Sequence, residues 1–231
     1  MHSATMVWPV SMGEGFVATP EAVEVMGAVV QSSLPELTRL RKGIWALPLT
    51  AETTGLLTVD HWKGGSFSIG YGLCCVWVPF SHRGGPKMEH RRTLKQSVRH
   101  LWVDHFTIDT PEPQYISQLH GVDRLQRHAR EAVNEAWSTA RRWWGSVSTP
   151  EGVLTEARRQ AANRFDVHSP RVRLVAAFTL ARLGDLAAAR VELDPVLDSM
   201  SGRDDERADQ LLALLEQAAG PDHAGPQPSR K

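Results

Sequence analysis

The chain has 231 residues, of which 42% are hydrophobic, enough for a sizeable core and too many for a disordered chain. Lysine and arginine together number 26, and so do aspartate and glutamate, so the formal net charge at pH 7 is zero. This balance removes the general electrostatic argument for binding nucleic acid or an anionic membrane. The length suits one compact domain, or a small α+β domain followed by a helical one.

Two further features bear on the compartment. Residues 1–15 contain no positively charged region followed by an apolar run, and no stretch of the sequence reaches the length of a membrane span. The only cysteines, Cys74 and Cys75, are neighbours that a strand would point to opposite faces, which disfavours a disulfide between them. We therefore expect a cytoplasmic protein without membrane contact, whose thiols are reduced and at least half buried.

The first predicted elements are a helix and two strands. Residues 21–34 carry apolar side chains at helical spacing between flanking prolines. Residues 43–49 are predicted as an edge strand, because Pro48 has no N–H to donate to a neighbour. Residues 56–62 are predicted as a further strand, which a hairpin turn at residues 63–65 connects to the next.

The strongest strand signal lies between Phe67 and Trp77, where every odd-numbered residue is large and apolar and the even-numbered residues are smaller. The large residues are Phe67, Ile69, Tyr71, Leu73, Cys75 and Trp77. This period of two predicts a strand that buries the odd-numbered face and organises the sheet. Because Gly70 and Gly72 leave the other face nearly bare, a helix or the backbone of a partner can come close on that side, and we expect the helix of residues 122–144 there.

The following segments are less regular. Residues 81–87 are predicted as a loop, and residues 88–101 fit either a helix or a strand. Residues 101–108 are predicted as a strand that ends before the prolines at positions 111 and 113.

The remainder of the chain is predicted to be helical. A continuous apolar stripe over residues 122–144 predicts a helix that packs against the sheet. A capping box of Ser148 and Glu151 predicts the start of the next helix. A further helix is predicted to begin at Ser169-Pro170, and Gly184-Asp185 separates it from the next one. That next helix is predicted to end or kink at Asp194-Pro195, and a last helix covers residues 204–218.

Residues 180–190 resemble the central turn of a tetratricopeptide-type helical hairpin, where small residues let two helices approach. One such hairpin cannot bury the continuous core that stacked repeats build, so we expect an isolated antiparallel hairpin rather than a peptide-binding array.

These elements together predict an α+β fold: an antiparallel sheet of about four to five strands flanked by helices, with a C-terminal helical hairpin region. The expected organisation is a flexible N-terminal segment over residues 1–19 and an α+β domain over residues 20–145. A helical region over residues 146–219 and a disordered tail over residues 220–231 follow.

The candidate catalytic residues come from a repeated pattern, Leu-x-Val-Asp-His-aromatic, which places Asp60-His61 and Asp104-His105 at matching positions. If the two strands are neighbours, His61 with His105, or Asp60 with Asp104, could converge. The two histidines with a carboxylate from elsewhere would suit zinc or iron. A catalytic Asp–His pair is a second possibility. The simplest interpretation is that each pair marks the polar end of a strand, because a strand points its Asp and His to opposite faces.

No cofactor is expected. The glycine pairs at residues 64–65, 70–72 and 84–85 form neither GxGxxG nor a Walker-type arrangement, and no HExxH or CxxC sets a metal-ligand spacing. We therefore expect no bound metal.

A basic segment is the candidate surface for a partner protein. It consists of Arg83, Lys87, Arg91, Arg92, Lys95 and Arg99. Such a concentration of positive charge steers encounter with an acidic surface, and the absence of interleaved aromatic residues makes nucleic acid a poor candidate. The alternative is that these side chains pair internally with the acidic C-terminal helices around Asp204, Asp205 and Glu206.

A layout of four features carries a resemblance. They are the helix at 21–34, the run Arg39-x-Arg41-Lys42-Gly43-Ile44-Trp45 where the chain enters the sheet, the strand at 66–78, and the helix that ends in Trp143-Trp144 before Thr149-Pro150-Glu151. This layout, over residues 20–160, resembles an uncharacterised bacterial family, a domain of unknown function with members encoded near polymorphic toxins and regarded as immunity proteins. The resemblance implies a small cytoplasmic binding protein and carries over no catalytic residue.

We therefore expect a non-enzymatic protein-interaction module that neutralises a toxin or regulates its partner. The competing hypothesis is a metal-dependent enzyme that uses the Asp60-His61 and Asp104-His105 pairs.

Overall fold

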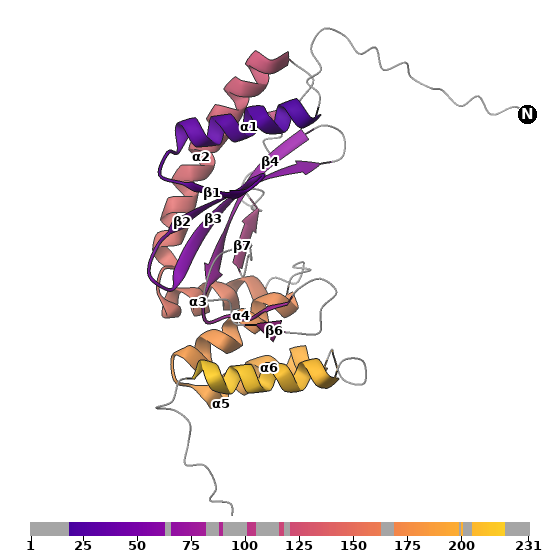
Figure 1. Ribbon diagram of the computed structural model, residues 1–231. Coiled ribbons are helices and arrows are strands. Elements are labelled where there is room, and N and C mark those ends of the chain that lie inside the picture. The colour runs from indigo at the N-terminus through magenta and orange to yellow at the C-terminus, as the bar shows by residue number, and fades with distance from the viewer. Residues whose placement is uncertain are drawn as a thin grey trace, which may run out of the picture.

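The computed structural model describes residues 19–62, 66–81, 88–89, 101–104, 116–117, 121–162, 169–198, 200 and 205–219 (Figure 1). The helices are α1 (Thr19–Ser33), α2 (Gly121–Ser146), α3 (Pro150–Ala161), α4 (Ser169–Arg182), α5 (Leu186–Asp198) and α6 (Asp205–Ala218). The strands are β1 (Thr38–Arg41), β2 (Ile44–Pro48), β3 (Thr53–Trp62), β4 (Ser66–Cys75), β5 (Phe80–Ser81), β6 (Met88–Glu89), β7 (Leu101–Asp104) and β8 (Ile116–Ser117).

Several predictions fall on segments outside the described residues. These are the flexible N-terminal segment up to residue 18, the hairpin turn at 63–65, the loop after Ser81, most of residues 88–101, the strand beyond Asp104 and the C-terminal tail.

The main sheet is antiparallel, with its strands in the order β1-β2-β3-β4-β7. The short strand β8 also pairs with β4, at Ser66 and Phe67, beyond the part of β4 that pairs with β7. Helices flank this sheet and form the C-terminal part of the chain (Figure 1). The predicted α+β class with an antiparallel sheet and a helical C-terminal region is therefore confirmed.

The edge of the sheet differs from the prediction. The strand predicted as an edge corresponds to β2, which lies between β1 and β3, and the edge strand is β1. Pro48 is tolerated because it is the last residue of β2, opposite Thr54. The four residues of β1 are exposed or half-buried, so they lack the alternation that would have marked a strand.

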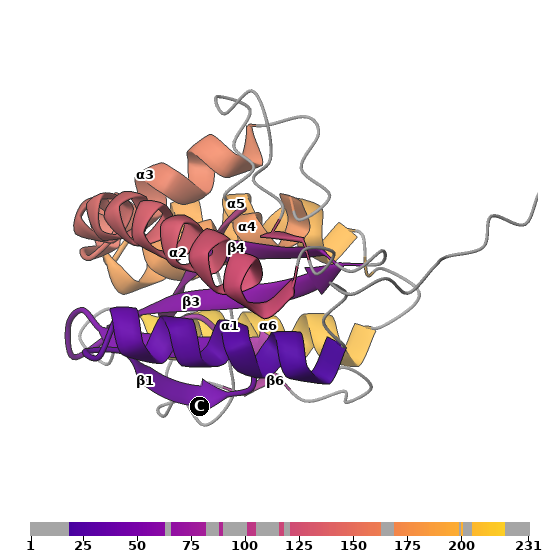
Figure 2. The ribbon, with the colours of Figure 1, turned by 90° about the horizontal axis from the view of Figure 1, so that it is seen from above.

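One face of the sheet is covered by α1 and α2, which lie side by side (Figure 2). The six odd-numbered residues from Phe67 to Trp77 are all buried, as predicted. Six such side chains contribute on the order of 10 kcal/mol before conformational entropy is subtracted. The rings of Tyr71 and Trp143 lie 5.5 Å apart, and Trp144 Nε1 donates a hydrogen bond of 2.9 Å to the carbonyl of Gly72. The helix therefore packs on the large side chains of β4.

The close approach of α2 occurs at a glycine that the sequence did not single out. A Cβ atom at Gly55 would lie 2.6 Å from Cε2 of Trp144, so only glycine leaves room for the indole. Gly55 pairs in register with Leu73 and thus shares the odd-numbered face of β4. The expectation that α2 would approach on the face of Gly70 and Gly72 is wrong, because Tyr71 and Gly55 lie against α2 from the opposite face.

Helix α3 begins one residue later than the predicted capping box requires. Thr149 is the N-cap, its side chain accepts a hydrogen bond from Gly152 N at 3.3 Å, and Pro150 occupies the first turn. Ser148 instead donates its hydroxyl to the carbonyl of Gly145. The start of the helix was therefore predicted correctly and its capping residue was not.

The C-terminal part contains the predicted hairpin of α4 and α5. Gly184 has a φ of +88° in the turn, and Asp185 Oδ1 accepts a hydrogen bond from Ala188 N at the start of α5. Helix α6 packs against both α4 and α5. Pro195 lies inside α5, so of the two alternatives, an end or a kink, the end is wrong and the kink stays a prediction.

Three side-chain contacts join the helical part to the end of the sheet. Trp77 Nε1 donates to Thr179 Oγ1 at 3.1 Å, and Arg182 forms an ion pair of 2.9 Å with Glu52. Thr53 Oγ1 donates a longer hydrogen bond of 3.5 Å to the carbonyl of Ser148. Within the described part, no helix combines the length and apolar composition that crossing a bilayer requires.

Candidate functional site

The first candidate site lies at the end of β3. Asp60 is half-buried and accepts a hydrogen bond of 3.0 Å from Thr58 Oγ1. His61 is exposed. Its ring lies 5.1 Å from the ring of Phe67, and both rings lie on the face of the sheet opposite Asp60. The Asp and His of this pair thus lie on opposite faces of the sheet, as period two requires.

The second pair does not join the first. Asp104 is the last residue of β7, and His105 lies outside the described residues. Strands β3 and β7 are not neighbours, because β4 lies between them and pairs with both. Asp104 pairs with Gly70, which pairs with Thr58 on its other side, so the two aspartate backbones are at least two strand spacings, about 10 Å, apart.

The condition under which the aspartates could converge is therefore not met. Among the described residues, moreover, no group of three or more His, Cys, Asp or Glu side chains could hold a metal ion.

The basic segment cannot be described atom by atom. Arg83, Lys87, Arg91, Arg92, Lys95 and Arg99 all lie outside the described residues. The strands that this part of the chain connects are described: β5 pairs with β6, β6 contacts α6, and β7 pairs with β4. Two of these strands, β6 and β7, therefore hold the chain at two places, one against the helical part and one in the main sheet.

A buried polar cluster that sequence reasoning missed lies where α2, α3 and β4 meet. Glu156 of α3 is buried, and its two oxygens accept hydrogen bonds of 2.7 Å from Arg159 Nε and Nη2. Gln160 Nε2 donates a third bond of 2.8 Å to Oε1. The signal in the sequence was the i, i+3, i+4 spacing of these three residues, which indicates a helical ion pair but not its burial.

The electrostatics of this cluster hold Glu156 ionised. Burial alone would raise the pKa of the Glu156 carboxyl, but the hydrogen bonds from Arg159 and Gln160 outweigh it and lower that pKa. The indole N–H of Trp143 adds to the effect, although it makes no hydrogen bond of good geometry. A carboxylate with three donors is neutralised and a poor proton acceptor.

Tyr71 extends the cluster into the sheet. Its burial, followed by the negative charge of Glu156, raises the pKa of the phenol, against the opposing effect of Arg142 and Arg159. Tyr71 therefore stays protonated at neutral pH.

The two cysteine thiols are also unreactive at neutral pH. Burial raises the pKa of Cys74 to about 12, and it raises that of Cys75 well above the ordinary value. Since the thiolate is the nucleophile and the metal ligand, neither side chain is activated at neutral pH. Cys75 is buried and Cys74 is partly buried, as expected, and neither forms a disulfide.

Comparison with family models, with curated proteins and with solved structures finds no match to this chain. The resemblance to the bacterial family of immunity proteins therefore stays a prediction.

Proposed function

We propose that this protein is a non-enzymatic protein-interaction module of the bacterial cytoplasm, and that it neutralises a toxin or regulates a partner through the basic segment. The segment comprises Arg83, Lys87, Arg91, Arg92, Lys95 and Arg99.

The observation that carries this proposal is that described strands hold the chain on both sides of the basic segment. The β5–β6 pair precedes and interrupts it, with β6 against α6, and β7 follows it in the main sheet. Binding residues are typically found in connections that a rigid scaffold positions. Here two parts of the fold supply that scaffold, and a concentration of positive charge lies between them in the sequence.

The state of the buried reactive groups also supports a binding role. Burial raises the pKa of Cys74, Cys75 and Tyr71 still further above neutral pH, so none of the three is activated as a nucleophile or a base. The carboxylate of Glu156 is taken up by Arg159 and Gln160. These groups are arranged for stability rather than for proton transfer or nucleophilic attack.

The contact between β6 and α6 also supports the alternative that the basic side chains pair with acidic residues of the same chain. The first turns of α6 carry Asp205, Glu206 and Asp209, and β6 lies within the basic segment. If the arginines pair with these acids, the segment stabilises the fold and is not available to a partner. Charge reversal in the segment separates the two possibilities.

The test is the double variant Arg91→Glu, Arg92→Glu. If the segment binds a partner, its charges act mainly on association. We then expect about a tenfold slower association with the captured partner and a weaker salt dependence, with a nearly unchanged melting temperature. Affinity capture from the native host followed by surface plasmon resonance measures the first two, and thermal melts measure the third.

The matched control is Arg124→Glu, Arg127→Glu, which makes the same charge change on the exposed face of α2 and should leave association unchanged. A large fall in melting temperature of the Arg91, Arg92 variant, with an unaltered set of captured proteins, would assign the segment to the fold. Stoichiometric zinc, iron or manganese that disappears in a His61→Ala, His105→Ala variant would favour the metal-dependent enzyme instead.

A further inference from the structure

The outer edge of β1 pairs with no strand among the described residues. Strand β1 is the last strand of the sheet and pairs on one side with β2, and no other described strand pairs with it. Thr38, Arg39 and Arg41 are exposed and Leu40 is half-buried. An exposed edge presents main-chain N–H and C=O groups that can pair with another extended segment.

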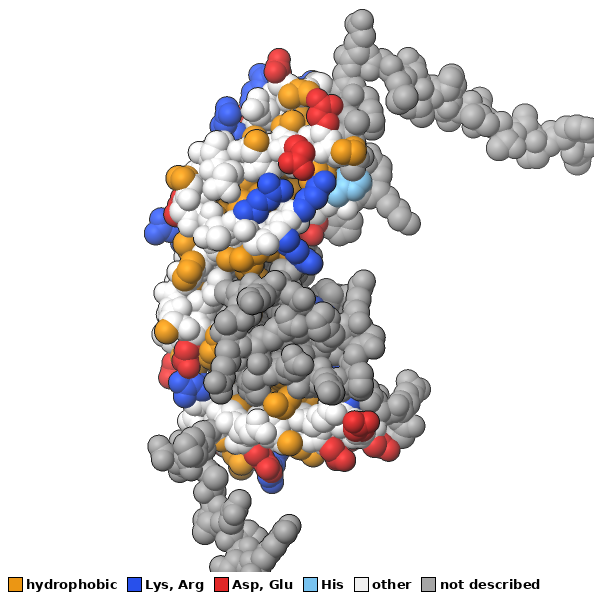
Figure 3. Space-filling model, in the orientation of Figure 1, with side chains coloured by type: hydrophobic (Ala, Val, Ile, Leu, Met, Phe, Trp, Pro, Cys, Tyr) orange, Lys and Arg blue, Asp and Glu red, His pale blue; other side chains and the backbone are white. Residues whose placement is uncertain are grey.

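Positive charge is concentrated at this edge. Arg39, Arg41 and Lys42 lie within four residues, and Figure 3 shows Lys and Arg side chains, with Asp and Glu side chains among them, on the upper half of the molecule. The guanidinium of Arg39 lies 5.8 Å from the centre of the Trp45 ring and also faces Gly27 of α1. Arg39 thus packs beside Trp45 while it remains exposed to solvent.

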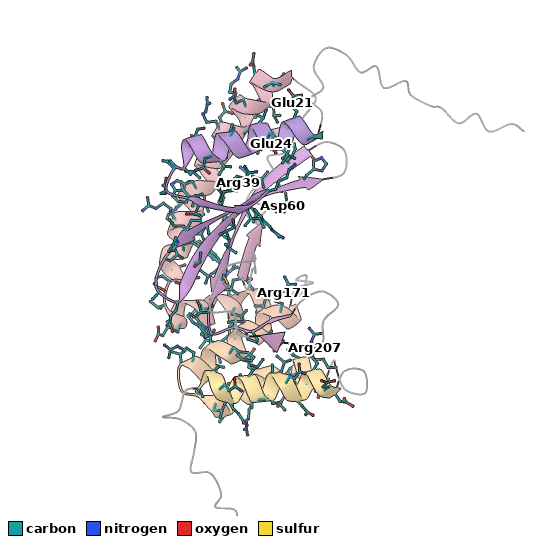
Figure 4. All side chains as sticks on the ribbon, in the orientation of Figure 1. Glu21, Glu24, Arg39, Asp60, Arg171 and Arg207 are labelled. Atoms are coloured by element: carbon teal, nitrogen blue, oxygen red, sulfur yellow. The ribbon has the colours of Figure 1, made fainter. Side chains whose placement is uncertain are left out.

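Acidic side chains lie near this edge as well as basic ones. Lys42 Nζ lies 3.8 Å from Glu24 Oε1, and both side chains are more than half exposed, so the pair is weak and screened. Figure 4 shows Glu24 and Glu21 on α1 and Asp60 on β3, around the labelled Arg39. Asp60 accepts a hydrogen bond from the neutral hydroxyl of Thr58 and keeps its negative charge. Arg39 and Arg41 are the cations on the edge strand itself, and both are exposed, so they are the residues expected to contact a strand added there.

A bulge distributes these two arginines over both faces. Arg39 pairs with Trp45 and Arg41 pairs with Ile44, with a register shift between them. Because paired residues share a face and Ile44 and Trp45 lie on opposite faces, Arg39 and Arg41 also lie on opposite faces. A strand added to this edge would meet one cation above the sheet and one below it.

A second copy of the chain is a poor occupant. Antiparallel pairing of two β1 edges would bring the arginines of one chain next to those of the other, and like charges across a strand pair are destabilising. An extended segment with acidic residues on both of its faces has the complementary charge.

We infer that the outer edge of β1 docks an extended acidic segment of the partner protein by strand addition. This inference rests on the proposed interaction function and names a surface, Arg39 and Arg41, separate from the basic segment.

The test uses the full chain and a fluorescein-labelled acidic peptide, TEVEEVT, followed by fluorescence anisotropy at low ionic strength. Arg39→Glu, Arg41→Glu should weaken binding at least about tenfold and should gain binding of the lysine counterpart, TKVKKVT. Because Arg39 packs over Trp45, the milder variant Arg39→Gln, Arg41→Gln is measured beside it, with melting temperatures for both. The control Arg124→Glu, Arg127→Glu should bind TEVEEVT as the natural chain does.

Two N-methylated forms of TEVEEVT, blocked at alternate amides, separate strand addition from simple charge attraction. We expect one form to lose binding at least about tenfold and the other to keep it, because only alternate N–H groups face the edge of the sheet. Equal binding by both forms, or no binding of TEVEEVT, would overturn the inference.

Two further results would bear on the occupant and on the proposed function. A dimer that TEVEEVT dissociates in sedimentation would also overturn the inference, by assigning the edge to a second copy. If the Arg39, Arg41 variant still binds the captured partner while Arg91→Glu, Arg92→Glu does not, only this inference fails and the proposed function stands.

Discussion

Both faces of β4 are buried, but they carry different kinds of side chain. The odd-numbered face carries Tyr71 and other large residues and packs against α1 and α2. The even-numbered face carries Ser68, Gly70 and Gly72, and continues into the buried Thr58 of β3. Helices α1 and α2 pack on the face whose large side chains offer more apolar surface to bury. The alternation of large and small side chains along β4, rather than burial alone, therefore shows which face these helices cover.

The largest expected effects are at Tyr71, on the helix-covered face, and at Trp77, whose indole bonds to Thr179 of α4 at the end of the sheet. Tyr71→Ala or Trp77→Ala should lower the free energy of unfolding by about 3–5 kcal/mol, because each removes a large buried ring. Urea denaturation measures this loss. The comparison variant Cys74→Ala, on the even-numbered face and only partly buried, should cost about 1 kcal/mol. Losses under about 1 kcal/mol for both ring deletions would contradict the assignment of the faces.

An intermediate effect is expected from adding one methyl group under α2. Gly55→Ala should destabilise the fold by about 1–3 kcal/mol, because the new Cβ would meet the Trp144 indole at 2.6 Å. Gly145→Ala is the matched control, since a Cβ there has no neighbour within 4 Å. In helix α2 that change should stabilise by about 0.5–1 kcal/mol. Chemical denaturation that shows Gly55→Ala to be neutral would mean that α2 does not approach so closely.

A smaller and pH-dependent effect is expected at Glu156, in the buried polar cluster of α3. The folded pKa of Glu156 lies below its unfolded value, so the ionised carboxylate stabilises the fold above the unfolded pKa, and this contribution is lost as the pH falls through the folded pKa. Glu156→Gln should therefore cost about 1–2 kcal/mol at pH 7, and the difference from the natural chain should shrink below about pH 4.

Melting curves across this pH range measure the difference at Glu156. The control Glu151→Gln changes an exposed residue of the same helix and should cost less than about 0.5 kcal/mol. A pH-independent loss in Glu156→Gln would show that the carboxylate contributes through shape alone.

The parts of the fold that follow from local periodicity were predictable. The alternation from Phe67 to Trp77 identified β4 and its buried face, and the apolar stripe of residues 122–144 identified α2. Both are long enough for the hydrophobic pattern to outweigh single residues. The capping signal near Thr149 located the start of α3 within one residue.

The missed features depend on contacts between distant segments. Strand β1 has exposed, charged side chains, so its pairing with β2 left no hydrophobic pattern. Gly55 matters because Trp144 reaches it from another part of the chain. Glu156 looked like a surface residue of α3 and is buried only because α3 packs near Tyr71 and Trp143. The separation of the two Asp–His pairs likewise required the strand order.

The hydrogen bond between Trp77 and Thr179 has a consequence for synthesis on the ribosome. The two residues are 102 positions apart, so at about 5–20 residues per second the acceptor is made roughly 5–20 seconds after the donor. Strands β1 to β4 pair with their sequence neighbours and need no such wait. For that interval the indole N–H of Trp77 lacks the acceptor that it has in the folded chain, so this end of the sheet is completed only when α4 has been made.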